Sequence, residues 1–500
     1  MCCSRLFCSG SLQDRIGAWL TARLQFFALC SGGVIDRVQD QKRDMLRSIV
    51  TLAWPTVLEQ ACQTGAQYID TAMVGQIGVQ ASAAVGLTTT ASWLSITPLS
   101  AIGIGVMACT SKAIGAQNPK RAGIACTQSV LLSVITGFVI GAIAVAVSPF
   151  LPGWLGAEEE IRKDAFLYFC ITSLPMVFRA AATILGAALR ATGNTKGPMV
   201  ITTMSILVNL VLNFLLIYPS RTFQLTEQIV VPLWGAGMGV IGAAVATGIS
   251  FIFNGVFMFL LLRKNQYYQI GRREAGISRS VLKECIRVGL PVALRCIVIY
   301  LGHIFFTGMI GKLGTLAIAA HSIALTAEKA FYIPGYGMQA AAATLAGTEA
   351  GRQDTERLKL MVRLMTGISL AIMTVLSLLL FFFPAQMMSL FTPDEQVIAE
   401  GARVLRIVAL SEPLFVIAVI VEGVFDGVGN VNTPFAVSVV ALWLARLIPT
   451  YICVNVLNLG LESVWWCMVC DNVLRCLLLW AMFYRRDWGA YFQRSASIAE

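Results

Sequence analysis

Acidic and amide side chains occur inside apolar stretches of this chain, where they can carry chemistry. Glu59, Gln63, Gln67 and Asp70 lie in one such stretch and fall within about 80° of one another on a helix, since each residue advances it by about 100°. A charged group in hydrocarbon is costly unless it faces a cavity or a partner. We therefore expect this stripe to line a bundle interior or a cleft, where Asp70 can exchange a proton or a cation.

Two asparagines further along the chain can complete a site with Asp70. Asn209 and Asn213 are four residues apart, so they share one face of a helix. Their amides can hydrogen-bond the Asp70 carboxylate or supply oxygen ligands to a small cation, and Gln67 can add another oxygen. The alternative is that the asparagines only hold helices together. The predicted ion-coupling set is Asp70, Asn209, Asn213 and Gln67, of which the first three are predicted Na⁺ ligands.

The spacing of proline, glycine and asparagine indicates an internal repeat. Pro291 follows Pro55 by 291 − 55 = 236 positions, and the same offset relates five further pairs. These are Gly75 and Gly311, Gly115 and Gly351, Gly193 and Gly429, Asn194 and Asn430, and Pro198 and Pro434. Two homologous apolar halves that face one another are typical of carriers, which move a solute between them.

The composition predicts an all-α membrane protein. Hydrophobic residues make up 57% of the chain and charged residues 13%, and the mean hydropathy is +0.74, which excludes an ordinary soluble domain. Apolar stretches long enough to span a bilayer predict about twelve helices in two parallel six-helix repeats. The predicted helices lie near 49–75, 83–112, 124–149, 164–190, 197–218, 233–262, 284–310, 317–348, 359–384, 399–424, 434–457 and 462–484.

The polar segments divide the chain and predict its orientation. We expect an N-lobe over 48–262 and a C-lobe over 284–487, joined by a basic linker over 263–283. Residues 1–47 are predicted to be a disordered or interfacial extension, or to precede a true start at Met45, and 488–500 form a tail. Basic loops stay cytoplasmic, so the distribution of Lys and Arg predicts a multi-pass protein of the cell membrane, the inner membrane in a bacterium, with both termini in the cytoplasm. The net charge of +10 suits an anionic leaflet better than a nucleic acid.

Cysteine and histidine give little support for a metal or redox site. Most of the 14 cysteines stand singly in apolar stretches, and there are only two histidines. The sequence contains no Walker lysine motif, nucleophile elbow or paired His-Glu zinc motif, so ATP hydrolysis and hydrolytic catalysis have no support. We expect no enzyme activity, no cofactor beyond a coupling ion, and a monomer whose partners are a small-molecule substrate and the bilayer.

Other charges and prolines inside the predicted helices need a role. Arg295 stands at the repeat position of Glu59, so the two charges can meet across a cleft if both point into it. Asp471 and Arg475 are four residues apart and are expected to neutralise each other. Three further charges have no partner that the sequence reveals, and two prolines, each in mid-helix, predict either hinges or packing curvature. The charges are Arg179, Lys329 and Glu422, and the prolines are Pro175 and Pro413.

Several motifs resemble those of multidrug and toxic compound extrusion (MATE) transporters. They are IDTAMVGQIG at 69–78, ALRATGNTKGPM at 188–199, NLVLNFLLIY at 209–218, HSIALTAEKAFYIPGYGMQAAAATLAG at 321–347, GVFDGVGNVNTP at 423–434 and ARLIPTY at 445–451. The resemblance extends from about residue 48 to 487. It implies a V-shaped, two-lobe fold of twelve helices and the export of amphipathic, often cationic compounds driven by inward flow of protons or sodium ions.

The resemblance also implies roles for particular residues. The coupling aspartate near the end of the first helix maps onto Asp70. A second aspartate that some prokaryotic members carry in the fifth helix is Asn213 here, and a glutamate of the seventh helix is Tyr300. Glu328 matches an acidic residue in the eighth-helix motif of a bacterial branch. The predicted substrate cleft therefore comprises Glu59, Gln63, Arg295, Tyr300 and Glu328.

The function predicted from the sequence is a secondary active antiporter that exports amphipathic, cationic drugs or metabolites. A flippase for lipid-linked intermediates is the second reading, and a membrane-embedded enzyme is the third. The sequence leaves the coupling ion open. Asn213 removes a proton acceptor but keeps an oxygen ligand, which favours sodium, whereas Asp70 alone would suffice for protons.

Overall fold

The computed structural model describes residues 12–226, 229–273 and 278–497. They belong to an N-terminal unit that ends at Thr51 and a main unit that begins at Leu52. Helix α1 (Leu12–Gly75) contributes to both, so the predicted N-terminal extension is helical from Leu12 onward. All of the sites discussed below lie in the main unit.

The first repeat of the main unit contains helices and one hairpin. After α1 come α2 (Val79–Gly115), α3 (Pro119–Val147), α4 (Leu151–Trp154), α5 (Glu159–Ser173), α6 (Met176–Ala191), α7 (Lys196–Leu216), β1 (Pro219–Thr226), β2 (Ile229–Ala236) and α8 (Gly239–Arg263). A short helix, α9 (Gln266–Arg273), follows in the predicted linker.

The second repeat has the same order of long helices. It comprises α10 (Arg279–Gly311), α11 (Thr315–Lys329), α12 (Ile333–Arg352), α13 (Thr355–Phe382), α14 (Pro384–Ser389), α15 (Glu395–Ala409), α16 (Glu412–Gly427), α17 (Asn432–Ala441), the π-helical segment η1 (Leu442–Leu447), α18 (Ile448–Asn455), α19 (Leu461–Arg485) and α20 (Trp488–Ser497).

The all-α prediction is confirmed, apart from the start of one segment and a break in another, since the helix predicted over 317–348 is divided into α11 and α12. Each of the twelve predicted segments falls on helix, and among the described residues eight helices, or ten spans when two bent pairs are included, are long and apolar enough to cross a membrane. The predicted helix over 233–262 begins too early, because strand β2 pairs antiparallel with β1 and α8 starts only at Gly239. Gly237 and Gly239 adopt positive φ angles of 64° and 54°, which separate the strand from the helix.

Two helices bend where the sequence places proline. α5 and α6 meet at Pro175 with an angle of 50°, and α15 and α16 meet at Pro413 with an angle of 56°. Proline lacks the N–H that would continue the hydrogen-bond ladder, so the chain turns at these points. The two bends lie in the fourth long helical segment of each repeat. Their use as hinges stays a prediction.

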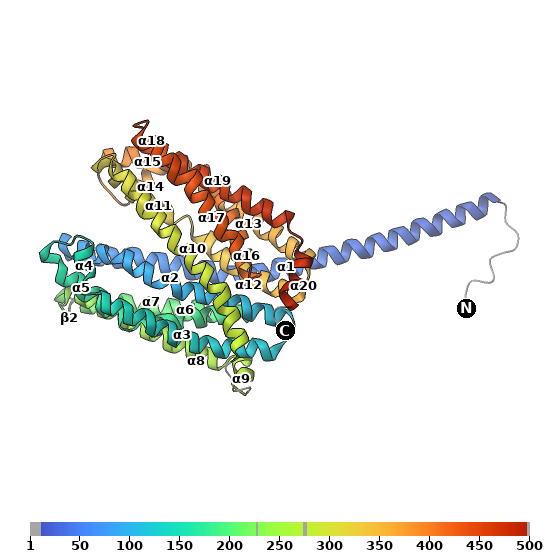
Figure 1. Cartoon of the computed structure of the whole chain (residues 1–500), viewed down its shortest axis with the longest axis horizontal. Helices are drawn as coiled ribbons and strands as arrows, with labels where there is room; N and C mark the ends of the chain where they lie inside the picture. Colours follow the sequence, from blue (N-terminus) through green and yellow to red (C-terminus); the bar gives the residue numbers. More distant parts are fainter. Residues whose placement is uncertain (1–11, 227–228, 274–277, 498–500) are drawn as a thin grey trace. The chain divides into compact units, whose positions relative to one another are not determined.

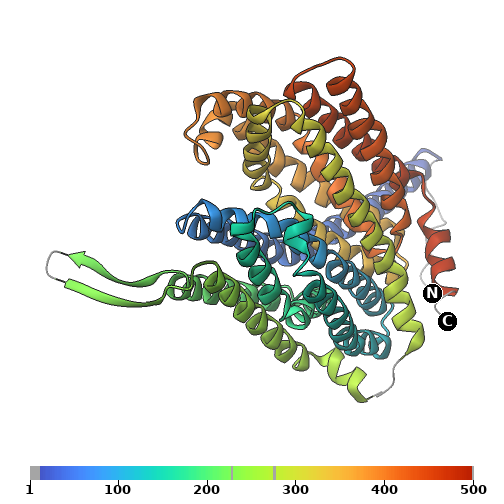
Figure 2. The same cartoon turned by 60° about the vertical axis from the view of Figure 1, so that its left-hand side comes forward.

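The two repeats of the main unit meet through small residues. In Figures 1 and 2 helices α2 to α8 gather in one group and α11 to α19 in another, while α10 packs against α2 of the first and α17 of the second. A Cβ on Gly115 would lie 1.9 Å from the Thr348 carbonyl oxygen, and a Cβ on Gly351 would lie 2.0 Å from that of Lys112. Because Gly115 and Gly351 are repeat mates, α2 and α12 cross close to a pseudo-two-fold axis.

Candidate functional site

The Asp70 carboxylate lies between α1 and α7. Asn213 donates a hydrogen bond from Nδ2 to Asp70 Oδ1 at 2.7 Å and another to Asn209 Oδ1 at 3.2 Å. Asn209 and Asn213 are buried on one face of α7, as their spacing requires. The structure therefore brings together three of the four residues that the sequence assigned to ion coupling.

The amides of Asn209 and Asn213 both reach the Asp70 carboxylate. The Asn209 amide, turned so that its nitrogen faces Asp70, donates to the two carboxylate oxygens at 3.0 and 3.2 Å. Asn213 Oδ1 is buried and has no hydrogen-bond partner among the described atoms. Neutral amide donors leave the negative charge of Asp70 in place, so a proton or a small cation can neutralise it.

Gln67 does not join the cluster. Its side chain is exposed, and its backbone carbonyl accepts a hydrogen bond from the Thr71 hydroxyl at 2.8 Å. Instead, Tyr168 of α5 lies within electrostatic reach of both Asp70 and Arg179. The Arg179 guanidinium lies 4.5 Å from the ring centre of Phe251. The sequence alone could not identify these neighbours of Arg179.

Glu59 is neutralised inside the first repeat. Its Oε2 lies 3.4 Å from Arg190 Nη1, and its Oε1 accepts hydrogen bonds from Thr202 at 3.2 Å and Gln63 at 3.5 Å. Arg190 belongs to the last turn of α6. Glu59 and Gln63 therefore form a buried network between α1, α6 and α7.

Arg295 has its own partners in the second repeat. It makes a two-pronged ion pair with Asp426 at 3.1 and 2.8 Å, and its Nη2 lies 3.1 Å from Glu422 Oε1. The expectation that Glu59 and Arg295 neutralise each other across a cleft is not what the structure shows, because each pairs within its own repeat. Glu422 thereby gains the partner that the sequence left open.

The two ion pairs occupy equivalent positions with their charges exchanged. Arg295 is the repeat mate of Glu59, and Asp426 is the repeat mate of Arg190, since 426 − 190 = 236. The first long helix of each repeat thus carries one charge and the fourth carries the opposite charge. Glu422 stands at the repeat position of Gly186. The ion-pair cluster of the second repeat therefore has one acidic side chain more than that of the first. The 236-residue offset relates both members of the two ion pairs and is the sequence signal for them.

A pair of buried carboxyl groups lies in the second repeat. Glu328 of α11 accepts a hydrogen bond from the Tyr332 hydroxyl, and its carboxyl group interacts with that of Glu412 in α16. Glu328 Oε2 and both Glu412 oxygens find no donor among the described atoms. Two neighbouring carboxyl groups disfavour ionisation of each other, so this pair can hold a proton. Sequence reasoning missed Glu412, which sits beside the helix break at Pro413.

The remaining predicted residues have different surroundings. Lys329 is exposed, and within the described part of the chain neither it nor Arg295 forms an ion pair with Glu328. Tyr300 of α10 lies beside Thr97 of α2, at the junction between the repeats.

The expected pairing of Asp471 with Arg475 is present at 3.3 Å, and Arg446 adds a second, closer contact at 2.7 Å. Arg446 lies in the π-helical segment η1, and the motif ARLIPTY contained it without indicating this partner.

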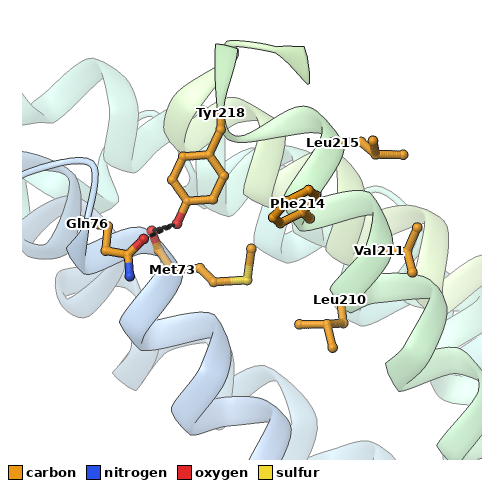
Figure 3. A pocket seen from close by; sticks show the side chains of 7 residues that line it. All are labelled: Met73, Gln76, Leu210, Val211, Phe214, Leu215 and Tyr218. Atoms are coloured by element: carbon orange, nitrogen blue, oxygen red, sulfur yellow. Dashed lines mark hydrogen bonds between the residues drawn. The ribbon is translucent and has the colours of Figure 1, made fainter. Parts of the chain in front are cut away.

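An apolar groove lies one turn beyond Asp70 (Figure 3). The groove has a volume of about 630 Å³. It is formed by α1, by the end of α7 and by Tyr218, which lies just beyond α7. The Tyr218 hydroxyl donates to Gln76 Oε1 at 2.8 Å and to the Met73 carbonyl at 3.1 Å, which closes one end. The lining residues are Met73, Gln76, Leu210, Val211, Phe214, Leu215 and Tyr218.

The sequence and fold match known transporters. The family described as MatE matches residues 55–215 and 291–452, and these ranges begin 236 positions apart (291 − 55), the offset of the internal repeat. The chain is 27% identical over 452 residues to the probable multidrug resistance protein NorM of Thermotoga maritima, covering 90% of this chain and 94% of that protein. It is 24% identical over 429 residues to the probable multidrug resistance protein YoeA of Bacillus subtilis, covering 85% and 90%.

Solved structures share the fold. A MOP superfamily transporter from Pyrococcus furiosus, described as having a binding pocket of reverse polarity, superposes with a TM-score of 0.81 at 23% identity and covers 89% of this chain and 96% of that one. A mutant of the Vibrio cholerae MATE transporter VcmN gives 0.80 at 20% identity, covering 90% and 99%. With the family match spanning both repeats, the chain belongs to the MatE family and is a multi-pass membrane transporter, not an enzyme.

Proposed function

We propose that the protein is a secondary active antiporter that exports amphipathic, cationic drugs or metabolites in exchange for Na⁺ or H⁺ by alternating access. The names of its relatives, probable multidrug resistance proteins, support drugs as a substrate class. The observation that carries the proposal is the Asp70 carboxylate, held between α1 and α7 by Asn213. Among the acidic groups of the first repeat, Glu59 is already neutralised by Arg190.

Exchange follows from the cost of an unpaired buried charge. A site that contains a bare carboxylate is disfavoured in any state that shields it from water, so it closes readily only when a cation or a proton neutralises it. A cationic substrate and the coupling ion can each do this at Asp70, but not together. Competition for one negative charge therefore couples inward movement of the ion to outward movement of the substrate.

The oxygens around Asp70 favour sodium as the coupling ion of the first repeat. Asn209 and Asn213 hold their amides beside the Asp70 carboxylate, and Asn213 Oδ1 is buried without a partner among the described atoms. A sodium ion needs several such ligands, whereas a proton needs only the carboxyl group. The Glu328 and Glu412 pair offers a proton site in the second repeat.

The groove beside Asp70 supports an amphipathic substrate. Its lining is apolar apart from Gln76 and Tyr218, and Met73 stands one helical turn from Asp70. The apolar body of a drug can fill this groove while its cationic group lies near the carboxylate. A volume of about 630 Å³ is within the range of small-molecule sites.

The proposal is tested in proteoliposomes that contain the full chain and a fluorescent organic cation. A sodium gradient at fixed pH is expected to drive export. Asp70→Asn should abolish that export, and Asn213→Ala should reduce it about tenfold, which is the effect of losing one ligand or hydrogen bond to a charged group. Asn254→Ala is the matched control, because Asn254 is also an intramembrane asparagine with an unpartnered oxygen but lies in α8, away from Asp70.

The outcomes separate the parts of the proposal. Normal export by Asp70→Asn would remove Asp70 from the mechanism. Export that follows the pH gradient alone, without response to sodium or to Asn213→Ala, would replace sodium by protons. Equal losses in Asn213→Ala and Asn254→Ala would assign the effect to helix packing.

A flippase for lipid-linked intermediates is the second candidate, and the apolar groove between α1 and α7 is the observation that favours it. In the same liposomes, a fluorescent lipid with a polyprenyl-like tail would then change leaflet faster than the organic cation crosses. Export of the cation with no effect on the lipid would exclude this alternative.

A further inference from the structure

A second groove lies at the beginning of α10, away from the sites described above. It has a volume of about 510 Å³, and all of its lining residues come from the first thirteen positions of that helix (291 − 279 + 1). They are Arg279, Leu282, Lys283, Ile286, Arg287, Leu290 and Pro291. We call it the α10 groove.

The groove combines a basic row with an apolar row. Arg279, Lys283 and Arg287 are four residues apart, so they lie above one another on one helix face, and all three are exposed. Ile286 and Leu290 form the adjacent row and are 40% and 56% exposed. This surface therefore presents positive charge and unburied hydrocarbon side by side.

The basic row lies on the side of α10 opposite its buried residues. The buried residues of this part of α10, including Val281, Cys285 and Val288, lie about 180° around the helix from that row and pack toward α2 of the first repeat. Beyond the groove the exposed face continues as large apolar side chains. They are Leu294, Leu301, Ile304 and Phe305. A continuous apolar face on a transporter helix is a surface for lipid chains.

The length of α10 sets the depth of the basic row. A helix of 33 residues is about 50 Å long, which exceeds the roughly 30 Å of the hydrocarbon layer. The three basic residues occupy its first nine positions (287 − 279 + 1), so they fall in the part that extends into the headgroup region. This is also the end at which the basic loops of the chain collect, as expected for the cytoplasmic leaflet.

Protein carboxylates do not neutralise the basic row. In the part of the chain that the structure describes, Arg279, Lys283 and Arg287 form no ion pair with a carboxylate. The acidic residue of this stretch, Glu284, is engaged by Arg121 at 2.7 Å and Lys112 at 3.8 Å. The positive charge of the row is therefore available to a ligand from outside the chain.

We propose that the α10 groove binds an anionic phospholipid of the cytoplasmic leaflet. Arg279, Lys283 and Arg287 contact its phosphate oxygens, and the acyl chains lie along Ile286 and Leu290. Charge complementarity and an apolar row at headgroup depth select a lipid, since a free phosphate has no group to occupy the apolar row. The inference rests on the membrane location of the chain and not on its substrate or coupling ion.

The binding is tested on the purified full chain in detergent, by native mass spectrometry and by titration with a fluorescent lipid. Phosphatidylglycerol is expected to bind at one saturable site, and phosphatidylcholine about 100-fold more weakly, because each basic residue near an anionic headgroup contributes about a fivefold gain in affinity. The variant Arg279→Gln/Lys283→Gln/Arg287→Gln should lose the same factor. Its melting temperature without lipid should match that of the parent chain, since the three side chains are exposed.

The matched control removes equal charge elsewhere. Lys42→Gln/Arg43→Gln/Arg47→Gln also deletes three exposed basic side chains at the predicted cytoplasmic end, and it should keep the site. Ile286→Ser should weaken phosphatidylglycerol binding, whereas Val375→Ser, at an exposed apolar position of α13, should not. Equal losses in both triple variants, equal binding of phosphatidylcholine, or displacement of the lipid by millimolar inorganic phosphate would each overturn the proposal.

Discussion

The exchanged ion pairs predict that the charges of the first repeat can be reversed together but not singly. Glu59→Arg places two guanidinium groups beside each other, and Arg190→Asp leaves Glu59 facing another carboxylate. The double variant Glu59→Arg/Arg190→Asp gives the first repeat the same arrangement of charges that Arg295 and Asp426 have at the equivalent positions of the second repeat. Thr202 can rotate its hydroxyl to accept from the new arginine, so the surrounding network can adapt.

The magnitude follows from the burial of the pair. The side chains of Glu59 and Arg190 are 9% and 19% exposed, and breaking such a pair costs about 3–5 kcal/mol. The main unit spans 500 − 51 = 449 residues, for which an unfolding entropy of about 2.1 cal/mol/K per residue converts this cost to a fall of roughly 3–5 °C in Tm. Each single variant should show that fall, and the double variant should return to within about 1–2 °C of the parent chain.

The assay is thermal unfolding of the purified variants in one detergent, analysed as a double-mutant cycle. The control is the exposed pair Glu400 and Arg403, whose reversal, Glu400→Arg/Arg403→Glu, should change stability by less than about 1 kcal/mol. A double variant whose Tm falls by the sum of the two single effects would refute the reasoning, because the positions would then require their particular residues and not merely opposite charges.

Three further predictions concern the second repeat. Glu328→Gln should weaken export of organic cations more than export of neutral compounds, measured as transport rates in the same liposomes; equal loss for both would make Glu328 structural. Gly351→Val should destabilise the protein by at least about 1–3 kcal/mol, because its Cβ would overlap the Lys112 carbonyl, and an unchanged Tm would contradict that packing. Asp471→Asn leaves Arg446 and Arg475 without their carboxylate and should cost about 3–5 kcal/mol by the same measurement, whereas Glu462→Gln, at an exposed acid of the same helix, should have little effect.

Local sequence information was sufficient for the helices. Apolar stretches long enough to span a bilayer must satisfy their own backbone hydrogen bonds, so composition and length predict them directly. The hairpin between α7 and α8 was missed because IVVPLWGA is a short apolar run, which composition does not assign to strand or helix. Asn209 and Asn213 could be placed together because a spacing of four residues puts two side chains on the same face of a helix.

Partners distant in the sequence required the tertiary structure. Asp70 could be identified as a coupling residue by its type and position, but only the packing of α7 against α1 brings Asn213 to it while leaving Gln67 exposed. Glu412 gave no signal, because its importance comes from Glu328 on another helix.

The sequence by itself determined that this chain is a duplicated, helical membrane protein and where its intramembrane charges stand. The tertiary structure decided which charges neutralise one another: Glu59 with Arg190, Arg295 with Asp426, and Asp471 with two arginines. The physical reason is range. Helix formation depends on neighbours within a few residues, whereas the energy of a buried charge depends on whatever lies within about 4 Å, and that is set by how the helices pack.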